Sequence, residues 1–407
     1  MSTPAPSADP TVAEHPLRNP NFRRWLLGGT ISLLGDQFYL VALPWLVLGL
    51  TGSALALGTV MMAGAIPRVV LMLFGGAASD YVSARKIMMA TATARAVFVA
   101  AIAIMVWSGI MRMWELYAVV VVFGVADAFA APAASAYLPS LVTREQMVAA
   151  SSLRQTTAQL SMIVGPAPAG LVVNLLGVAS AFLIDAFSFL FIIAALWRLP
   201  DPPPSHAVHK NVLHAIAEGI AYVVRDVPLR ALMLLVAVLN FCISGPVVVG
   251  LAYLTRTKLG GAGTYGLMIS AVAAGSLLGA VIAGAWKMRR RGVMILLASL
   301  LLGICLASIG LLANAWSIAG VLFLMGVTAG LVNVHIGAWI MQRIETAVRG
   351  RVSSVLMLAS IGMAPVSLAV AGFLLAWSLK GMFLIAGAVM LLVALGAALR
   401  KSVREIA

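Results

Sequence analysis

The chain has 407 residues, of which 62% are hydrophobic and only 10% are charged, and its formal net charge is +14. A water-soluble fold cannot bury so large an apolar share, so the composition excludes an ordinary globular protein and indicates a membrane protein. A charge of this size would suggest nucleic-acid binding in a soluble protein. Its placement along the chain decides against that class.

Twelve apolar stretches account for most of the chain, and few of them contain a charge. Each has about the 20 residues that a helix needs to cross the hydrocarbon core of a bilayer. The sequence therefore predicts an all-α membrane protein with twelve transmembrane helices. The stretches begin near Trp25, Ser53, Met88, Glu115, Ala149, Val178, Leu229, Thr264, Val293, Ser317, Ser353 and Gly381.

Nearly all lysine and arginine residues gather in alternate loops. If the N-terminus is cytoplasmic, the opposite side holds only Arg112, Arg256, Lys258 and Lys380. This bias follows the positive-inside rule and predicts that both termini are cytoplasmic. The excess charge is thus a topology signal, and no nucleic-acid partner is expected. We expect a multi-pass protein of a bacterial inner membrane.

The longest polar interruption separates six apolar stretches from six others. It opens with a stiff proline-rich segment at 199–204 and continues with apolar residues on one helical face, which predicts an amphipathic helix on the cytoplasmic surface. Five parts are predicted: a disordered cytoplasmic tail at 1–20, a six-helix bundle at 21–198, a cytoplasmic linker at 199–228, a second six-helix bundle at 229–400 and a cytoplasmic tail at 401–407.

The two halves repeat each other at an offset of about 200 residues, a parallel arrangement typical of major facilitator transporters. Gly165-Pro166 in the fifth stretch corresponds to Ala364-Pro365 in the eleventh. Arg144 corresponds to Arg349 and Arg351. A six-plus-six fold with a cytoplasmic linker is therefore expected.

The loop between the second and third stretches resembles the signature loop of the major facilitator superfamily. Gly76, Asp80 and Arg85 fit its pattern, whereas Tyr81, Ser83 and Ala84 depart from it. Further segments resemble the macrolide-efflux and enterobactin-exporter branch: Ala42-Leu43-Pro44, Leu138-Pro139-Ser140, Asp185-Ala186-Phe187-Ser188-Phe189 and Arg349-Gly350-Arg351. The resemblance implies a monomeric, proton-coupled exporter that contacts membrane lipids, exchanges protons for a small-molecule substrate and needs no cofactor.

Five charged residues fall inside the predicted membrane spans, where a charge is costly and marks a functional candidate. They are Asp36, Arg68, Arg95, Asp127 and Asp185, all in the N-terminal half. Asp36 and Arg68 lie at similar depth on consecutive helices, so we expect them to pair. The alternative for such a pair is a structural lock between two helices.

In the superfamily, helices 1, 4, 7 and 10 line the central cavity. The resemblance therefore makes Asp36 and Asp127 cavity residues, together with the neutral Asn240, Asn333 and His335, and assigns Arg95 and Asp185 a structural role on supporting helices. Three carboxylates and two guanidinium groups leave one acid without a partner. Such an acid binds a proton more readily in an apolar cavity than in water, and the sequence favours either Asp127 or Asp36 as this carrier.

A second set of residues is expected to control opening and closing. The resemblance implies a cytoplasmic latch in which the loop of Gly76, Asp80, Arg85 and Lys86 meets Arg349 and Arg351; the alternative is a solvated turn. A proline removes one backbone hydrogen bond and kinks a helix. Gly165, Pro166 and Pro365 are therefore candidate bending points.

The leading hypothesis is a transporter that exports amphipathic, drug-like molecules by proton antiport. A dedicated exporter of a siderophore, lipid or sugar is the main alternative, and a receptor without transport activity on the same scaffold is another. An enzyme is not expected, because no phosphate loop or nucleophile–base set is apparent. Cys242 and Cys305 lack partners for a metal site and are expected to be buried hydrophobic residues.

Overall fold

The computed structural model describes residues 15–203, 212–285, 291–344 and 349–399, and the regular elements in these ranges are all helical. Within them, 12 helical segments are long and apolar enough to cross a membrane. This confirms the predicted all-α fold with twelve transmembrane helices.

The N-terminal bundle contains the first six spans. Its helices are α1 (Pro20–Thr51), α2 (Ala54–Tyr81), α3 (Ala84–Trp107), α4 (Met113–Tyr137), α5 (Met147–Val164) with α6 (Pro166–Leu176), and α7 (Val178–Trp197). A helix outside the spans, α8 (Val212–Arg225), follows and packs against α9 and α14.

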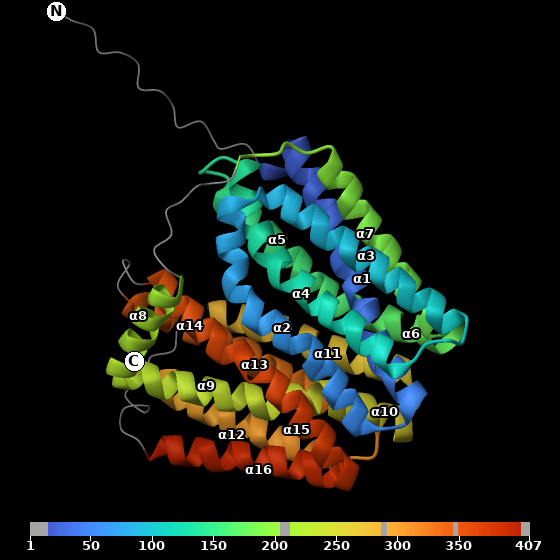
Figure 1. Cartoon of the computed structure of the whole chain (residues 1–407). Coiled ribbons are helices and arrows are strands. Elements are labelled where there is room, and N and C mark those ends of the chain that lie inside the picture. Colours follow the sequence, from blue (N-terminus) through green and yellow to red (C-terminus); the bar gives the residue numbers. More distant parts are fainter. Residues whose placement is uncertain (1–14, 204–211, 286–290, 345–348, 400–407) are drawn as a thin grey trace, which may run out of the picture.

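The C-terminal bundle contains the other six spans. Its helices are α9 (Val227–Gly245) with a π-helical turn (Pro246–Gly250) and α10 (Leu251–Lys258), α11 (Ala262–Ala285), α12 (Arg291–Ile309), α13 (Ala315–Arg343), α14 (Arg349–Gly362) with α15 (Ala364–Trp377), and α16 (Leu379–Ala398). Figure 1 shows the two bundles beside each other. In this view α8 and the end of α16 lie at the left and the start of α1 lies at the top, on the side that we call the linker face; the other ends form the opposite face.

Ordered structure begins before the predicted bundle boundary at residue 21. Pro16–Arg18 form a short 3-10 helix, and Asn19 caps α1 by accepting hydrogen bonds from the backbone N–H groups of Asn21 and Phe22. The Asn19 Nδ2 also donates to Leu141 O at 2.6 Å. Residues 15–20 are therefore structured, in contrast to the disordered tail expected there. Residues 1–14 and 401–407 lie outside the described part of the chain.

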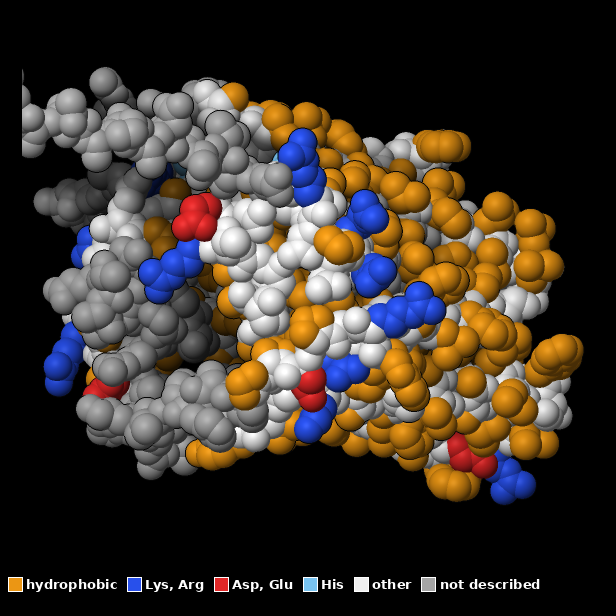
Figure 2. Space-filling model, turned by 90° about the horizontal axis from the view of Figure 1, so that it is seen from above, with side chains coloured by type: hydrophobic (Ala, Val, Ile, Leu, Met, Phe, Trp, Pro, Cys, Tyr) orange, Lys and Arg blue, Asp and Glu red, His pale blue; other side chains and the backbone are white. Residues whose placement is uncertain are grey.

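The outer surface has the side-chain distribution of a membrane protein. Five tryptophans at helix ends are strongly exposed: Trp107, Trp114, Trp316 and Trp377 at the opposite face, and Trp197 at the linker face. Tryptophan is enriched at the two membrane–water interfaces. In Figure 2, apolar side chains cover the right part of the visible surface, and most of the visible lysine and arginine side chains lie left of it.

The two bundles meet through small residues in the half of the molecule nearer the opposite face. A Cβ on Gly58 of α2 would lie 2.6 Å from the Leu368 carbonyl oxygen of α15. A Cβ on Gly266 of α11 would lie 2.1 Å from the Pro166 carbonyl oxygen at the start of α6. Glycine lets helix backbones approach this closely. The α2–α15 and α6–α11 contacts thus join the bundles.

Three spans are interrupted. The fifth breaks at Gly165, between α5 and α6, and the eleventh breaks at Met363, between α14 and α15. Both interruptions were predicted from Gly165-Pro166 and Pro365. The third, a π-helical turn that begins at Pro246 in the seventh span, was not predicted.

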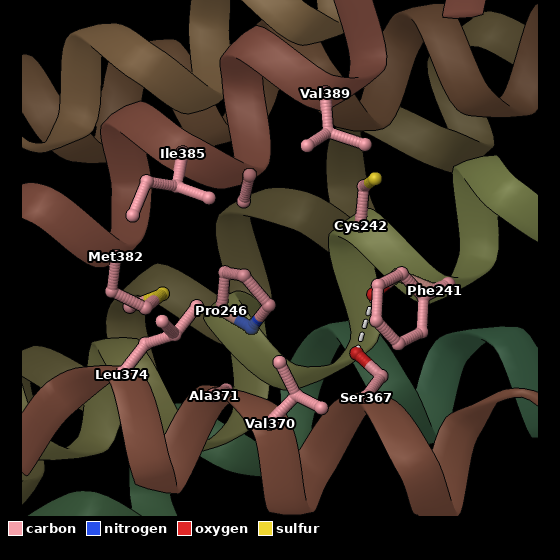
Figure 3. A pocket seen from close by; sticks show the side chains of 11 residues that line it. Phe241, Cys242, Pro246, Ser367, Val370, Ala371, Leu374, Met382, Ile385 and Val389 are labelled. Carbon is pink, nitrogen blue, oxygen red and sulfur yellow. Dashed lines mark hydrogen bonds between the residues drawn. The ribbon is translucent and has the colours of Figure 1, made fainter.

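A serine from another helix supports the break at Pro246. The Ser367 hydroxyl of α15 accepts a hydrogen bond from the Gly245 N–H at 2.7 Å and donates one to the Phe241 carbonyl. Figure 3 shows the second of these bonds. In an uninterrupted α-helix, a carbonyl and the N–H four residues later bond each other. The hydroxyl therefore sits between two groups of the α9 backbone and ties α15 to it.

Candidate functional site

An ion pair joins α2 and α4 where these helices touch. A Cβ on Gly124 would lie 2.1 Å from the Gly64 carbonyl oxygen. Arg68 follows Gly64 by one turn and Asp127 follows Gly124 by three residues, so both side chains start beside the contact. Arg68 Nε lies 2.9 Å from Asp127 Oδ2, and the arginine side chain is 53% exposed. This pair is therefore open to its surroundings.

A second ion pair joins α1 and α3. Arg95 Nη2 donates a hydrogen bond to Asp36 Oδ1, and the Asp36 side chain is 24% exposed. The expected Asp36–Arg68 pair is thus wrong, since each member has another partner. Equal depth along two helices does not fix the direction in which their side chains point. Here α2 packs against α4, whereas α1 and α3 both pack against α7.

Aromatic rings surround the buried guanidinium group of Arg95. Its Cζ lies 4.3 Å from the ring centroid of Phe123 and 4.6 Å from that of Phe189. The Tyr39 ring stacks on Phe123 with centroids 4.2 Å apart and an angle of 3°. Aromatic faces attract cations, and more strongly where water is excluded. These rings and Asp36 therefore hold Arg95 inside the bundle.

The third acid, Asp185 of α7, is fully buried beside this pair. Gly35 allows α1 to approach here, since a Cβ on it would lie 2.9 Å from Asp185 Oδ1 and 1.9 Å from Ser188 Oγ. The Ser188 hydroxyl donates to the backbone carbonyl of Asp185 at 2.7 Å. Asp36 and Arg95 are the charged groups that act on Asp185 electrostatically.

Neither carboxylate oxygen of Asp185 has a hydrogen-bond partner in the described part of the chain, and the same holds for Arg95 Nε. Asp36 and Asp127 each have an arginine partner. The acid without a partner is therefore Asp185, whereas the sequence favoured Asp36 or Asp127. Arg95 and Asp185, expected as separate structural charges, lie in one cluster with Asp36.

Two of the three polar candidates of the C-terminal bundle, Asn240 and His335, bond their own helices. Asn240 Nδ2 donates to the Val236 carbonyl at 2.9 Å. His335 is buried, with Nδ1 at 2.9 Å from the Leu331 carbonyl oxygen. Asn333 is exposed on α13, a helix that packs against α11 and α12. The structure thus does not join these three residues to the acids of the N-terminal bundle.

The loop between α2 and α3 contacts its own bundle and the segment after α7. Arg85 Nε donates to the Leu196 carbonyl at 2.7 Å, and Arg85 Nη1 lies 3.9 Å from Asp201 Oδ2. Lys86 Nζ lies 3.8 Å from the same carboxylate, which also bonds the Ser83 hydroxyl. Arg85 and Lys86 are therefore held at the end of α7. Gly76, Asp80, Arg349 and Arg351 lie in described helices, but their side chains lie outside the described part.

Three polar contacts between the described parts of the bundles were missed by sequence reasoning, one of them from Gln159 Nε2 of α5 to the Ala273 carbonyl of α11 at 3.3 Å. Asn174 of α6 accepts a hydrogen bond from the Ala262 N–H at the start of α11, at 3.0 Å. Near the opposite face, Arg256 Nη1 of α10 donates to the Trp45 carbonyl of α1 at 3.4 Å. For the Asn174 contact, the sequence signal was an asparagine at the end of an apolar stretch, and the partner of this asparagine lies 88 positions away.

The described residues contain no group of three or more His, Cys, Asp or Glu side chains able to hold a metal ion. A small pocket of about 80 Å³ lies between α9, α15 and α16, lined almost entirely by apolar side chains. Phe241, Cys242 and Pro246 line it from the seventh span, Ser367, Val370 and Leu374 from α15, and Ile385 and Val389 from α16 (Figure 3). This pocket surrounds the Pro246 break and belongs to the C-terminal bundle, apart from the charged cluster.

Solved transporters share this architecture. A mutant of the nucleoside transporter NupG superposes with a TM-score of 0.79 at 12% identity, covering 93% of this chain and 99% of that one. A POT family transporter in complex with a thioalcohol-conjugated peptide superposes with a TM-score of 0.72 at 11% identity, covering 93% and 95%. At this identity the likeness establishes the fold. The two six-helix bundles thus have the fold of these solved transporters.

The particular family follows from the sequence. The chain belongs to the transmembrane secretion effector family, whose model matches residues 11–407. The multidrug efflux pump Tap of Mycolicibacterium fortuitum is 29% identical over 388 residues, which are 91% of this chain and 93% of that protein. Macrolide efflux protein A of Streptococcus pyogenes is 24% identical over 294 residues, 71% and 72% of the two chains. The resemblance to the macrolide-efflux branch is confirmed, and the family consists of transporters rather than enzymes.

Proposed function

We propose that this protein exports amphipathic, drug-like molecules by proton antiport with alternating access. One observation carries the proposal: two arginines and three acids lie at membrane depth in a single bundle. Charges at membrane depth are costly and therefore rare, and where they occur they mark substrate, ion or proton pathways. The named activities of the relatives, multidrug and macrolide efflux, support export as the direction and drug-like molecules as the substrate class.

The positive-inside bias supports placing the linker face in the cytoplasm. The protein then lies in the inner membrane with both termini inside the cell and works as a monomer.

In the present arrangement the bundles are joined near the opposite face, through α2–α15 and α6–α11. Bending at Gly165-Pro166 and near Pro365 opens these contacts when the substrate is released outside. Asp80, with Arg349 and Arg351, closes the cytoplasmic side in that second state.

The proton enters through the partly exposed acids. Asp36 and Asp127 side chains are each 24% exposed, which supports access of water to both from the cavity. Each has an arginine partner that neutralises it when it is ionised. Protonation of either acid frees its arginine, and this change in pairing links the proton to the arrangement of α1–α4. Asn240, Asn333 and His335 are polar contacts for the substrate in the other bundle.

The test is export from proteoliposomes under an imposed pH gradient, with ethidium, rhodamine 6G and erythromycin as probes. We expect gradient-dependent transport by the wild type that stops when an ionophore collapses the gradient. Asp36→Asn and Asp127→Asn should each reduce it, because an amide can neither relay a proton nor form an ion pair with the partner arginine. Glu145→Gln, a change at an exposed acid in the loop before α5, is the matched control. Gradient-independent transport by the wild type would reject antiport.

The alternative function is export of one dedicated metabolite, such as a siderophore, lipid or sugar. The partly exposed Arg68–Asp127 pair favours it, since it offers both a cation and an anion to a polar substrate. Failure of every probe in the panel, together with a metabolite retained by cells that lack the protein, would select this alternative.

A further inference from the structure

We propose that Asp185 is the proton-binding site of the transport cycle, with Arg95 as the group that neutralises it after the proton leaves. This inference rests on the proposed proton antiport and names the site that holds the proton in the conformation described here.

Burial and the neighbouring Asp36 favour a neutral Asp185 side chain, although Arg95 and the Ser188 hydroxyl act in the opposite direction. The residue is fully buried, and neither carboxylate oxygen has a hydrogen-bond partner in the described part of the chain. An ionised carboxylate buried without a partner is among the most unfavourable groups that a protein interior can hold. A protonated carboxyl group removes that penalty. The geometry therefore corresponds to the acid form of Asp185.

The neighbouring helices give the same result by charge counting. On α1, the titratable groups near Asp185 are Asp36 and Tyr39, and on α3 the charged group is Arg95. No titratable side chain comes from α6, which also packs against α7. With both acids ionised, the group of Asp36, Asp185 and Arg95 has a net negative charge inside a ring of aromatic side chains. One proton makes it neutral.

The structure also contains the means of releasing that proton. Arg95 bonds Asp36 through Nη2, while its Nε is buried and has no hydrogen-bond partner in the described part of the chain. Gly35 has no side chain beside Asp185 Oδ1. Arg95 already acts on Asp185 electrostatically, so we infer that a change in the Arg95 side chain brings its guanidinium into contact with both acids.

Release of the proton transfers it to water and leaves a carboxylate on Asp185. The O–H bond of Asp185 breaks, the proton passes to water next to the partly exposed Asp36, and the new carboxylate pairs with Arg95. Uptake on the other side reverses these steps. Because two acids share one guanidinium, the cluster exchanges one proton per cycle. The sequence analysis assigned Asp185 a structural role, and a structural ion pair would instead require an ionised Asp185 in contact with Arg95.

The experiment compares wild type, Asp185→Asn and Asp185→Glu in the same proteoliposomes with ethidium as the probe. Proton release is measured with a pH indicator when ethidium binds to the purified protein. The asparagine has the shape of the protonated acid, so we expect Asp185→Asn to fold and to bind ethidium. It should release no proton and should not accumulate ethidium against a gradient. Asp185→Glu should release protons with a displaced pH midpoint.

The outcomes separate this inference from the proposed function. Absence of gradient-driven transport in the wild type rejects antiport itself. Gradient-driven transport and proton release at wild-type levels in Asp185→Asn overturn the assignment to Asp185 and leave antiport intact. If Asp185→Asn does not fold, Asp185→Glu decides: an unchanged pH midpoint of proton release overturns the assignment, and a displaced one supports it.

Discussion

The two bundles share one architecture and differ in how they treat buried polar groups. The N-terminal bundle holds Asp36, Arg95 and Asp185 in a cluster at membrane depth, and Arg68–Asp127 on an exposed side. At comparable depth, the polar groups that the structure describes in the C-terminal bundle are neutral, and Ser367 supports a broken helix backbone there. Both bundles contain a broken helix, but the charged side chains described at membrane depth belong to the N-terminal bundle.

The difference matters because a buried ion pair and a broken helix backbone oppose helix movement in different ways. A buried ion pair fixes two helices until a proton removes one charge. A hydroxyl inserted between backbone groups keeps them satisfied while the helix bends. If each half has its own task, changes in one half should affect proton coupling and changes in the other should affect conformational exchange.

The largest effect is expected from removing the buried cation. Arg95→Ala leaves Asp36 without its partner inside the bundle and should lower the free energy of unfolding by about 3–5 kcal/mol. Arg68→Ala is the matched control, because Arg68 is 53% exposed; its loss should be below about 1 kcal/mol. Chemical unfolding in detergent measures both. Equal losses of unfolding free energy in the two variants would show that the burial of Arg95 adds nothing to stability beyond what the exposed Arg68 contributes.

An intermediate effect is expected from the C-terminal bundle. Ser367→Ala removes the partner of the Gly245 N–H and of the Phe241 carbonyl, which should cost about 1–3 kcal/mol. Ser360→Ala on α14 is the control, since the Ser360 hydroxyl donates to the Leu356 carbonyl of its own helix. Thermal unfolding measures the loss of stability, and single-turnover transport measures the change in conformational exchange. The comparison between bundles fails if Ser367→Ala changes proton release and leaves conformational exchange unaltered.

The fold could be predicted from the sequence because it depends on quantities that lie along one chain. The lengths of the apolar stretches and the residues Gly165-Pro166 and Pro365 were enough to predict the spans and two of their breaks. Helix pairing is different, because it depends on the direction in which each side chain points around its helix. Depth alone therefore suggested Asp36–Arg68, although Arg95 and Asp127 are the actual partners.

Single polar residues in apolar helices were the hardest to interpret. Ser367 and Asn174 have no distinctive neighbours in sequence, and their partners lie 126 and 88 positions away. Their roles become visible only when the other helix is in place. The same holds for Asp185, whose lack of a partner can be recognised only once Asp36 and Asp127 have each been matched with an arginine.

The smallest effect is expected at the contact between the bundles. Asn174→Ala removes the side-chain cap of α11, which should cost about 1 kcal/mol. Asn314→Ala is the control, because Asn314 caps α13 within one bundle by accepting from the Trp316 N–H at 2.9 Å. Both changes should lower stability equally, but only the first weakens a bond that must break for the opposite face to open.

Spin labels at Ser108→Cys and Lys380→Cys, one in each bundle at the opposite face, measure that opening; the native Cys242 and Cys305 are buried. With a cap energy of about 1 kcal/mol, the open population should rise roughly fivefold in Asn174→Ala. Asn314→Ala should leave the distance distribution as in the wild type. An equal change in both variants would mean that Asn174 stabilises α11 alone and that the glycine contacts of α2–α15 and α6–α11 hold the bundles together.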